Sequence, residues 1–189
     1  MRKHQKAILF LEDGLFFKGK SLGSLGETSG EVCFNTGMTG YQEILTDPSY
    51  AKQMIVMCSP HIGNYGTNES DVESSNIYAS GFIIKNESLS PSNWRSSSSL
   101  EEFLKSNKVV GIQDIDTRAL TIHIRNNGSM KGIISTNDFD IDSLAKKIKD
   151  IPSMEGLDLA KEVSRKEKTT LCSVDNPKYK IAAIDYGMK

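Results

Sequence analysis

The stretch GEVCFNTGMTGYQEILTDPSYAKQ, residues 30–53, contains the changes of pattern that decide the fold. Residues 31–35 alternate polar and apolar side chains, as a half-buried strand does. A glycine-bearing loop follows, with one helical turn at YQEIL. Residues 54–57, just beyond the stretch, form a continuous apolar run that is typical of a central strand. The centre of the chain is therefore predicted to be strand, loop with a helical turn, and buried strand.

Toward the N-terminus the pattern predicts a β-hairpin. Residues 6–11 have β-strand character, Asp13-Gly14 is a strong two-residue turn, and residues 15–17 begin the return strand. Residues 19–30 hold four glycines among serines, and we expect a loop there.

Toward the C-terminus short strands alternate with helices. Strands are expected near Ile83 and Ile84 and over residues 109–112 and 132–135, and the serine-rich residues 88–99 are expected to be a surface loop. Ser99 and Glu102 have capping-box spacing, with Leu100, Phe103 and Leu104 as the buried stripe of the helix that follows. A second helix should begin at Asp116 and end at Asn127-Gly128, with its buried face at Ala119, Leu120 and Ile124. A third covers residues 142–151 and stops at Pro152.

This order of elements divides the chain into three parts. Strands followed by alternating short strands and helices indicate an α/β or α+β layered domain over residues 1–152. Residues 153–178 connect it onward, and from residue 162 they are polar and charged, as in a linker. The run YKIAAID after them is expected to be a buried strand, so residues 179–189 would begin a second domain.

Composition narrows the class of protein. The 189 residues are 38% hydrophobic, and 23 lysines and arginines nearly balance 24 aspartates and glutamates. No overall charge would attract nucleic acid or an anionic membrane. The apolar run near the N-terminus is too short for an export signal or a membrane span, so we expect a cytoplasmic protein with small-molecule or protein partners.

Cysteine and histidine provide no recognisable metal or nucleophile motif. Cys33, Cys58 and Cys172 are widely spaced, with no CxxC pair and no histidine pair near them, so neither a zinc site nor a disulfide framework is expected. Cys33 and Cys58 stand in apolar runs and are expected in the core. The loop over residues 35–41 lacks the spacing and the lysine of a phosphate-binding loop.

The segment FNTGMTGYQEILTDPSY resembles a signature of the small, glutamine-using subunit of carbamoyl-phosphate synthetase. Further segments resemble that family in the family's order, and together they span nearly the whole chain: PHIGNYG (60–66), DVES (71–74), SNWR (92–95), DIDTRALT (114–121) and GLDLAKEVS (156–164). The final YKIAAIDYGMK is similar to the first strand of the family's class I glutamine amidotransferase domain.

The resemblance implies a layered β/β/α domain of the swivelling type, followed by the truncated start of the amidotransferase domain. It implies a subunit that hydrolyses L-glutamine and passes ammonia to a large subunit, which uses ATP and Mg²⁺ to make carbamoyl phosphate for arginine and pyrimidine synthesis. A class I glutaminase needs a cysteine between flanking glycines, and none of the three cysteines here has that setting. The catalytic Cys, His and Glu are therefore expected beyond Lys189, and this fragment alone is expected to be inactive, with no cofactor of its own.

Ser49 is the one residue that the resemblance assigns to a site. From the residues alone, a serine after proline is a turn residue. The family places the serine of its DPSY turn where the hydroxyl helps to hold L-glutamine in the amidotransferase domain, and residues 47–50 match that turn.

Other residues keep two interpretations. The favoured interpretation is a helix cap and helix surface for Asp116, Thr117 and Arg118, and the alternative is a contact of these residues to the large subunit. His61 lies in a tight loop, with a structural or subunit-contact role favoured over acid-base work, and His123 is expected to be an ordinary helix residue.

Two rival functions remain open. One is a non-catalytic scaffold for an ammonia-dependent synthetase, in a family member whose glutaminase has lost its cysteine. The other is a free-standing interaction domain, which is disfavoured because the final strand would have no sheet to join.

Overall fold

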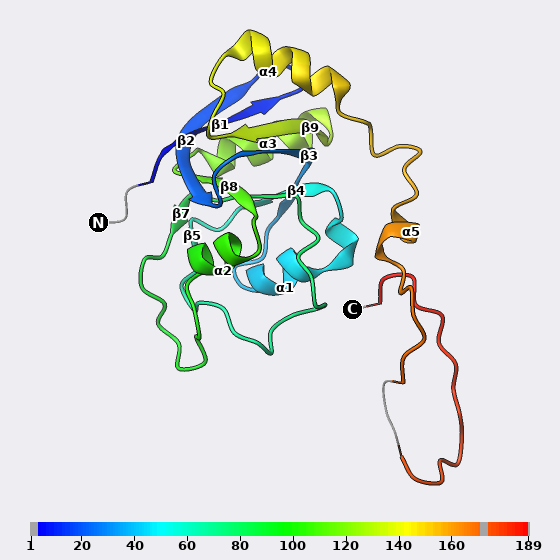
Figure 1. Ribbon diagram of the computed structural model, residues 1–189. Helices are drawn as coiled ribbons and strands as arrows, with labels where there is room; N and C mark the ends of the chain where they lie inside the picture. Colours follow the sequence, from blue (N-terminus) through cyan, green and yellow to red (C-terminus); the bar gives the residue numbers. More distant parts are fainter. Residues whose placement is uncertain (1–3, 171–173, 189) are drawn as a thin grey trace.

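The computed structural model describes residues 4–170 and 174–188, and most of its strands close into a barrel (Figure 1). The barrel strands are β1 (Lys6–Leu11), β2 (Phe16–Gly23), β3 (Glu27–Asn35), β4 (Gln53–Met57), β6 (Gly81–Ile83), β8 (Val110–Gln113) and β9 (Met130–Ser135). Their order around the barrel is β1-β2-β8-β6-β4-β3-β9. Outside it, β5 (His61–Ile62) pairs in parallel with β7 (Asn86–Glu87).

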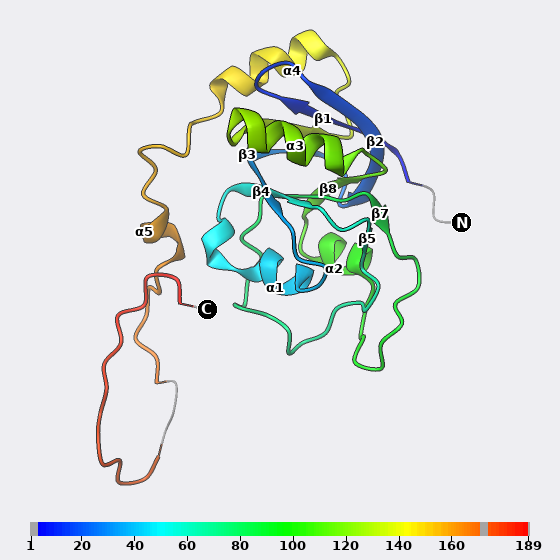
Figure 2. The ribbon, with the colours of Figure 1, turned by 180° about the vertical axis from the view of Figure 1, so that it is seen from behind.

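Helices cover the barrel from several sides. They are α1 (Tyr41–Thr46), the 3₁₀ turn η1 (Pro48–Tyr50), α2 (Leu100–Ser106), α3 (Thr117–Asn127), α4 (Ile141–Lys147) and the 3₁₀ turn η2 (Ile148–Asp150). The short helix α5 (Leu159–Val163) lies away from the barrel (Figure 1). Figure 2 shows α3 across the near face of the barrel, α4 above it, and α1 and α2 below. Across residues 4–170 and 174–188, every helix is too short or too polar to traverse a bilayer.

The barrel combines parallel and antiparallel pairing. Strands β3, β4, β6 and β8 pair in parallel, in the registers Val32↔Met54, Ile55↔Phe82 and Ile83↔Ile112. The hairpin β1–β2 and the strand β9, which joins β1 to β3, are antiparallel. The α/β class predicted from the sequence is therefore confirmed, with a sheet that closes on itself.

Three apolar clusters form the core. One joins Leu9 of β1 and Met54 of β4 to Leu120 and Ile124 of α3. Because β1 and β4 lie on opposite sides of the strand order, this cluster fills the barrel interior. A second cluster packs α1 and α2 against the outer face of the parallel strands, and a third packs α4 and η2 against Ile8 and Phe10 of β1.

The predicted hairpin and the predicted helix starts are confirmed. Strand β1 pairs with β2 through the turn at Asp13-Gly14. Ser99 Oγ accepts the Glu102 N–H at 3.3 Å while the Glu102 carboxylate accepts the Ser99 N–H at 3.0 Å, which is the reciprocal capping box. Asp116 caps α3 by accepting the N–H of Ala119 at 2.9 Å.

Two local predictions were wrong. Residues 19–30 are mostly strand, because β2 runs to Gly23 and β3 begins at Glu27. The glycines let strands approach closely: a Cβ on Gly30 would lie 2.4 Å from the Lys52 carbonyl oxygen. On α3, Ala119 is exposed and Thr117 is buried instead, since the buried stripe runs through Thr117, Leu120 and Ile124.

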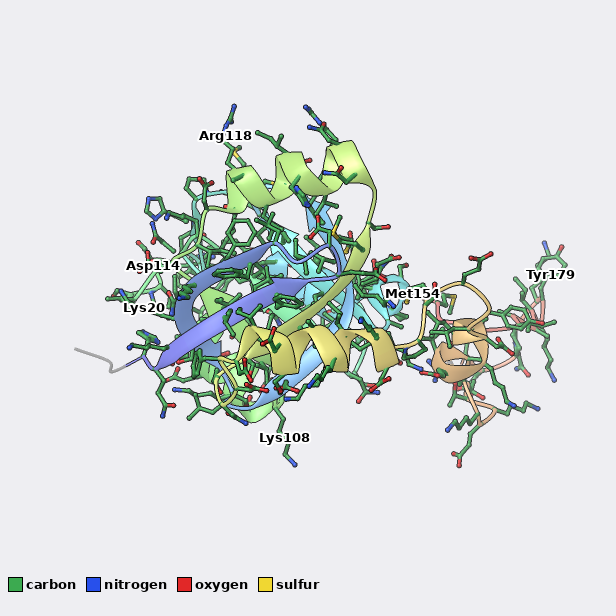
Figure 3. The ribbon with its side chains drawn as sticks, turned by 90° about the horizontal axis from the view of Figure 1, so that it is seen from above. Lys20, Lys108, Asp114, Arg118, Met154 and Tyr179 are labelled. Carbon is green, nitrogen blue, oxygen red and sulfur yellow. The ribbon has the colours of Figure 1, made fainter. Side chains whose placement is uncertain are left out.

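The C-terminal part also differs from the prediction. The connecting segment contains the short helix α5, and residues 179–185 form no strand. Tyr179, Ile181 and Ile184 are 74%, 92% and 79% exposed, and Figure 3 shows Tyr179 far from the barrel. A strand needs a neighbour for its main-chain groups, and no barrel strand lies beside this segment in the described chain.

Candidate functional site

The DPSY turn presents Ser49 to solvent on a fixed backbone. Pro48 begins the 3₁₀ turn, and its ring restricts the backbone before Ser49. The Asp47 carboxylate accepts the Ser49 N–H at 2.8 Å. Pro48 is buried and Ser49 is exposed, and the Ser49 hydroxyl makes no hydrogen bond to any residue that the structure describes. The hydroxyl is therefore positioned and available to a ligand.

The turn is anchored to the end of strand β3. The Asn35 amide donates to Tyr50 Oη at 3.2 Å, and its carbonyl oxygen accepts the Gly37 N–H at 2.7 Å. Asn35 thus links the turn to the glycine-bearing loop of the signature.

That loop is held by an aromatic pair. Tyr65 Oη accepts the N–H groups of Gly40 at 2.6 Å and Tyr41 at 3.1 Å, at the start of α1. The rings of Tyr41 and Tyr65 stack with centroids 4.2 Å apart, and Tyr41 Oη donates to the Gly66 carbonyl at 2.6 Å. Because protein groups already occupy the N–H groups of Gly37 and Gly40, this loop cannot cradle a phosphate through them.

Helix α1 is joined by polar side chains to the loop that follows β5. Gln42 is fully buried. Its side-chain amide donates a hydrogen bond to the Asn68 carbonyl, and its Oε1 accepts the Asn68 N–H at 2.9 Å. Thr46 Oγ1 accepts the Glu73 N–H at 3.0 Å. Most polar residues of the signature therefore have structural partners, which distinguishes them from Ser49.

The C-terminal segment approaches the same turn. A Cβ on Gly187 would lie 3.4 Å from Pro48 Cβ. Beside it, Lys52 Nζ lies 2.5 Å from Glu162 Oε1 of α5. Gly187 therefore lies close to the DPSY turn.

No glutaminase nucleophile is assembled among residues 4–170 and 174–188. Burial raises the pKa of the Cys33 thiol to about 12, so that thiol stays protonated. The half-buried Cys58 lies 3.3 Å from Thr121 Oγ1, and neither cysteine contacts a histidine in this part of the chain. Cys172 lies outside the described residues.

The other sequence candidates are dispersed. His61 is exposed on β5, and His123 Nε2 lies 2.6 Å from Asp13 Oδ2 of the hairpin turn. Arg118 projects away from α3, as Figure 3 shows, while Asp114 pairs with Lys20 at 2.9 Å. The structure does not bring any of these residues to Ser49.

One cluster was missed from the sequence. His4, Glu87 and Glu101 place potential metal-ligand atoms within 4.8 Å of one another, the one such group in the described ranges. Lys105 Nζ already lies 2.8 Å from Glu101 Oε1, and Glu87 Oε1 accepts the Glu101 N–H at 3.1 Å. The arrangement is thus an ion-paired cluster that joins His4, just before β1, to α2. The three residues share no sequence motif, so no local signal could have found it.

Comparison of the whole sequence with known proteins finds the same family that the signature over residues 30–53 resembles. The family model described as the carbamoyl-phosphate synthase small chain, CPSase domain, matches residues 9–134. The carbamoyl phosphate synthase small chain of Thermotoga maritima is 52% identical over 187 residues, covering 98% of this chain and 47% of the relative. That of Aquifex aeolicus is 48% identical over 200 residues, covering all of this chain and 53% of the relative. The chain spans about half the length of the curated relatives it matches.

Proposed function

The chain belongs to the carbamoyl-phosphate synthase small-chain family, and from this premise we propose that it is the N-terminal domain of a glutamine-hydrolysing subunit. The complete enzyme would convert glutamine, bicarbonate and two ATP to carbamoyl phosphate in the cytoplasm, for arginine and pyrimidine synthesis, with ATP and Mg²⁺ on the large subunit. The observation that carries the proposal is the identity of 52% over 98% of this chain with one small chain.

In this proposal the barrel is the swivelling-type domain over residues 1–152, and residues 179–189 begin the amidotransferase domain after the connecting residues 153–178. Two features support that division. The barrel and its covering helices end at η2 (Ile148–Asp150). The apolar side chains of Tyr179, Ile181 and Ile184 are exposed, and a strand of a neighbouring sheet would bury them.

Ser49 is the proposed contact to L-glutamine. Its hydroxyl can donate one hydrogen bond and accept others, which suits the carboxylate or the ammonium group of an amino acid. The Asp47 carboxylate and the Pro48 ring hold the turn before any ligand arrives, so binding would not have to order it.

The large subunit is the proposed protein partner, and the outer face of α3 is a proposed part of its contact surface. Arg118 extends from this face into solvent (Figure 3). A guanidinium there can bind a carboxylate of a partner in a two-point contact.

Replacing Ser49 in the complete subunit tests the glutamine contact. Ser49→Ala should raise the KM for glutamine about ten- to 150-fold, the effect of one hydrogen bond to a charged group of about 1.5–3 kcal/mol. The kcat for glutamate release should stay unchanged if the bond is equally strong in the ground and transition states. Ser90→Ala, at another exposed serine far along the chain, is the matched control. An unchanged KM for Ser49→Ala would contradict the assignment.

A second experiment tests the division of roles. The 189-residue chain should bind the large subunit in a calorimetric titration and release no glutamate from glutamine, since neither described cysteine has a histidine partner. Glutamate release at the rate of the complete enzyme would overturn the proposal. A complete enzyme that uses ammonia but never glutamine would instead identify the domain as part of a non-catalytic scaffold.

A further inference from the structure

A polar contact holds the C-terminal segment to Arg165, two residues after the end of α5. Arg165 Nε donates to Asp185 Oδ2 at 2.9 Å, and the Arg165 N–H donates to the Asp185 carbonyl at 3.3 Å. The two residues are therefore joined by one hydrogen bond between their side chains and a second between their main chains. Such a two-point contact fixes orientation as well as distance.

The Asp185 carboxylate also shapes the segment after it. Its Oδ1 accepts the N–H of Gly187 at 2.9 Å and the N–H of Met188 at 2.7 Å. These main-chain donors and the Arg165 guanidinium lower the pKa of Asp185 to about 2. The carboxylate therefore stays ionised well below the pH at which an ordinary aspartate takes up a proton, and it keeps its hydrogen bonds to the turn over residues 185–188 there.

That turn packs against both α5 and the DPSY turn. A Cβ on Gly187 would lie 2.7 Å from Val163 Cγ2 and 3.4 Å from Pro48 Cβ, and Gly187 has a φ of +100°. A side chain at this position would be strained and would push the segment away from Pro48. The ion pair of Lys52 with Glu162 ties α5 to the chain just after Ser49.

We propose that Arg165 and Asp185 are positioning residues that clamp the first turn of the following domain against the DPSY turn. The clamp sets the spacing between the Ser49 hydroxyl and the glutamine that the following domain would bind. This inference rests on the proposed function, and it assigns to α5 and to residue 165 a role that the signature does not contain.

The clamp relies on polar contacts and has little apolar packing behind it. An open hollow of about 650 Å³ borders Arg165, Ala160 and Tyr186. Of the groups that bond the Asp185 carboxylate in the described residues, the Arg165 guanidinium is the one that comes from outside the turn over residues 185–188, so the clamp depends on it.

The test is a double-mutant cycle in the complete subunit with its large subunit. Arg165→Ala should raise the KM for glutamine about three- to tenfold, at most the effect of Ser49→Ala itself, and leave the ammonia-dependent rate unchanged. Arg165→Lys, which keeps the charge but loses the guanidinium geometry, should recover part of the affinity. In the Ser49→Ala background, Arg165→Ala should have little further effect because both act through one hydroxyl. Lys166→Ala, which removes the neighbouring charge, is the control.

A second readout follows the clamp directly. In the 189-residue chain, the amide hydrogens of Gly187 and Met188 should exchange faster in Arg165→Ala than in the parent, while barrel amides keep their protection. Equal exchange would overturn the clamp.

The outcomes separate the two claims. If Ser49→Ala raises the KM and Arg165→Ala matches the control, the proposed function stands and the clamp is wrong. If the two effects multiply in the double variant, the clamp does not act through Ser49, and the inference fails. If Arg165→Ala raises the KM and Ser49→Ala does not, both the glutamine contact of Ser49 and its positioning by the clamp are wrong.

Discussion

Removing the hydroxyl of Tyr65 should destabilise the fold more than removing that of Tyr41, although the two phenols stack on each other. In Tyr65→Phe the start of α1 loses its acceptor, because Tyr65 Oη receives the N–H groups of Gly40 and Tyr41. In Tyr41→Phe only one bond is lost, the one to the Gly66 carbonyl. Both variants keep the aromatic stack at 4.2 Å.

The magnitude follows from how buried each orphaned group is. Tyr41 is fully buried, so its N–H cannot turn to water and should cost about 1–3 kcal/mol when unpaired. Gly40 is only partly buried, so water can replace much of its bond. Tyr41→Phe leaves the carbonyl of Gly66, which is also buried, without its donor, and should lower the free energy of unfolding by about 1–2 kcal/mol, because a carbonyl tolerates a missing partner better than an N–H does. We expect Tyr65→Phe, which orphans two N–H groups, to lower it by about 2–3 kcal/mol.

Urea unfolding followed by far-UV circular dichroism measures both. With a slope of about 2 kcal/mol per molar, Tyr65→Phe should lower the midpoint by about 1 M at unchanged slope. A midpoint shift for Tyr65→Phe no larger than that for Tyr41→Phe would refute the capping role of the Tyr65 hydroxyl.

Three further predictions concern single groups. The Cys33 thiol, with its pKa raised to about 12 by burial, should react with iodoacetamide at pH 8 about 10³-fold more slowly in the folded chain than in urea; comparable rates would contradict its burial. Hydrogen bonds from Ser143 and Lys147 lower the pKa of Asp138 to about 2, so its ionised form stabilises the fold above about pH 4, and that contribution disappears as the pH falls toward 2. The difference in unfolding free energy between the parent and Asp138→Asn should therefore shrink over that range, and a constant difference would argue against the ion pair. Gly30→Ala should lower the free energy of unfolding by about 1–3 kcal/mol, because the added Cβ would lie 2.4 Å from a main-chain oxygen. A thermal unfolding midpoint equal to that of the parent would show instead that the strands can move apart.

Local signals in the sequence predicted the local parts of the fold. The capping box of Ser99 and Glu102 and the cap at Asp116 involve residues three positions apart, so their geometry follows from the helix itself. The hairpin followed from its Asp13-Gly14 turn. The DPSY turn was also recognisable, since Pro48 restricts the backbone before Ser49.

Long-range contacts explain what the sequence could not show. The glycines of residues 19–30 resemble loop residues until the opposing strand is known. In the fold, a Cβ on Gly19 would lie 2.3 Å from the Gln113 main-chain oxygen, which explains why position 19 has no side chain. Residues 179–185 have strand composition but no neighbouring strand in the described chain. The clamp of Arg165 and Asp185 joins positions 20 residues apart with no shared motif.

The strand order of the barrel constrains how the chain can fold during its synthesis. The N-terminal hairpin finds its outer neighbours only in β8 and β9, through pairs such as Leu22↔Gly111 and Ile8↔Ser135. Until a ribosome has released residues as late as 135, the nascent β1, β2 and β3 carry unpaired edges that could join other chains. Closure must therefore wait for late-emerging strands, and slow translation before β9 would lengthen the interval in which a chaperone has to protect those edges.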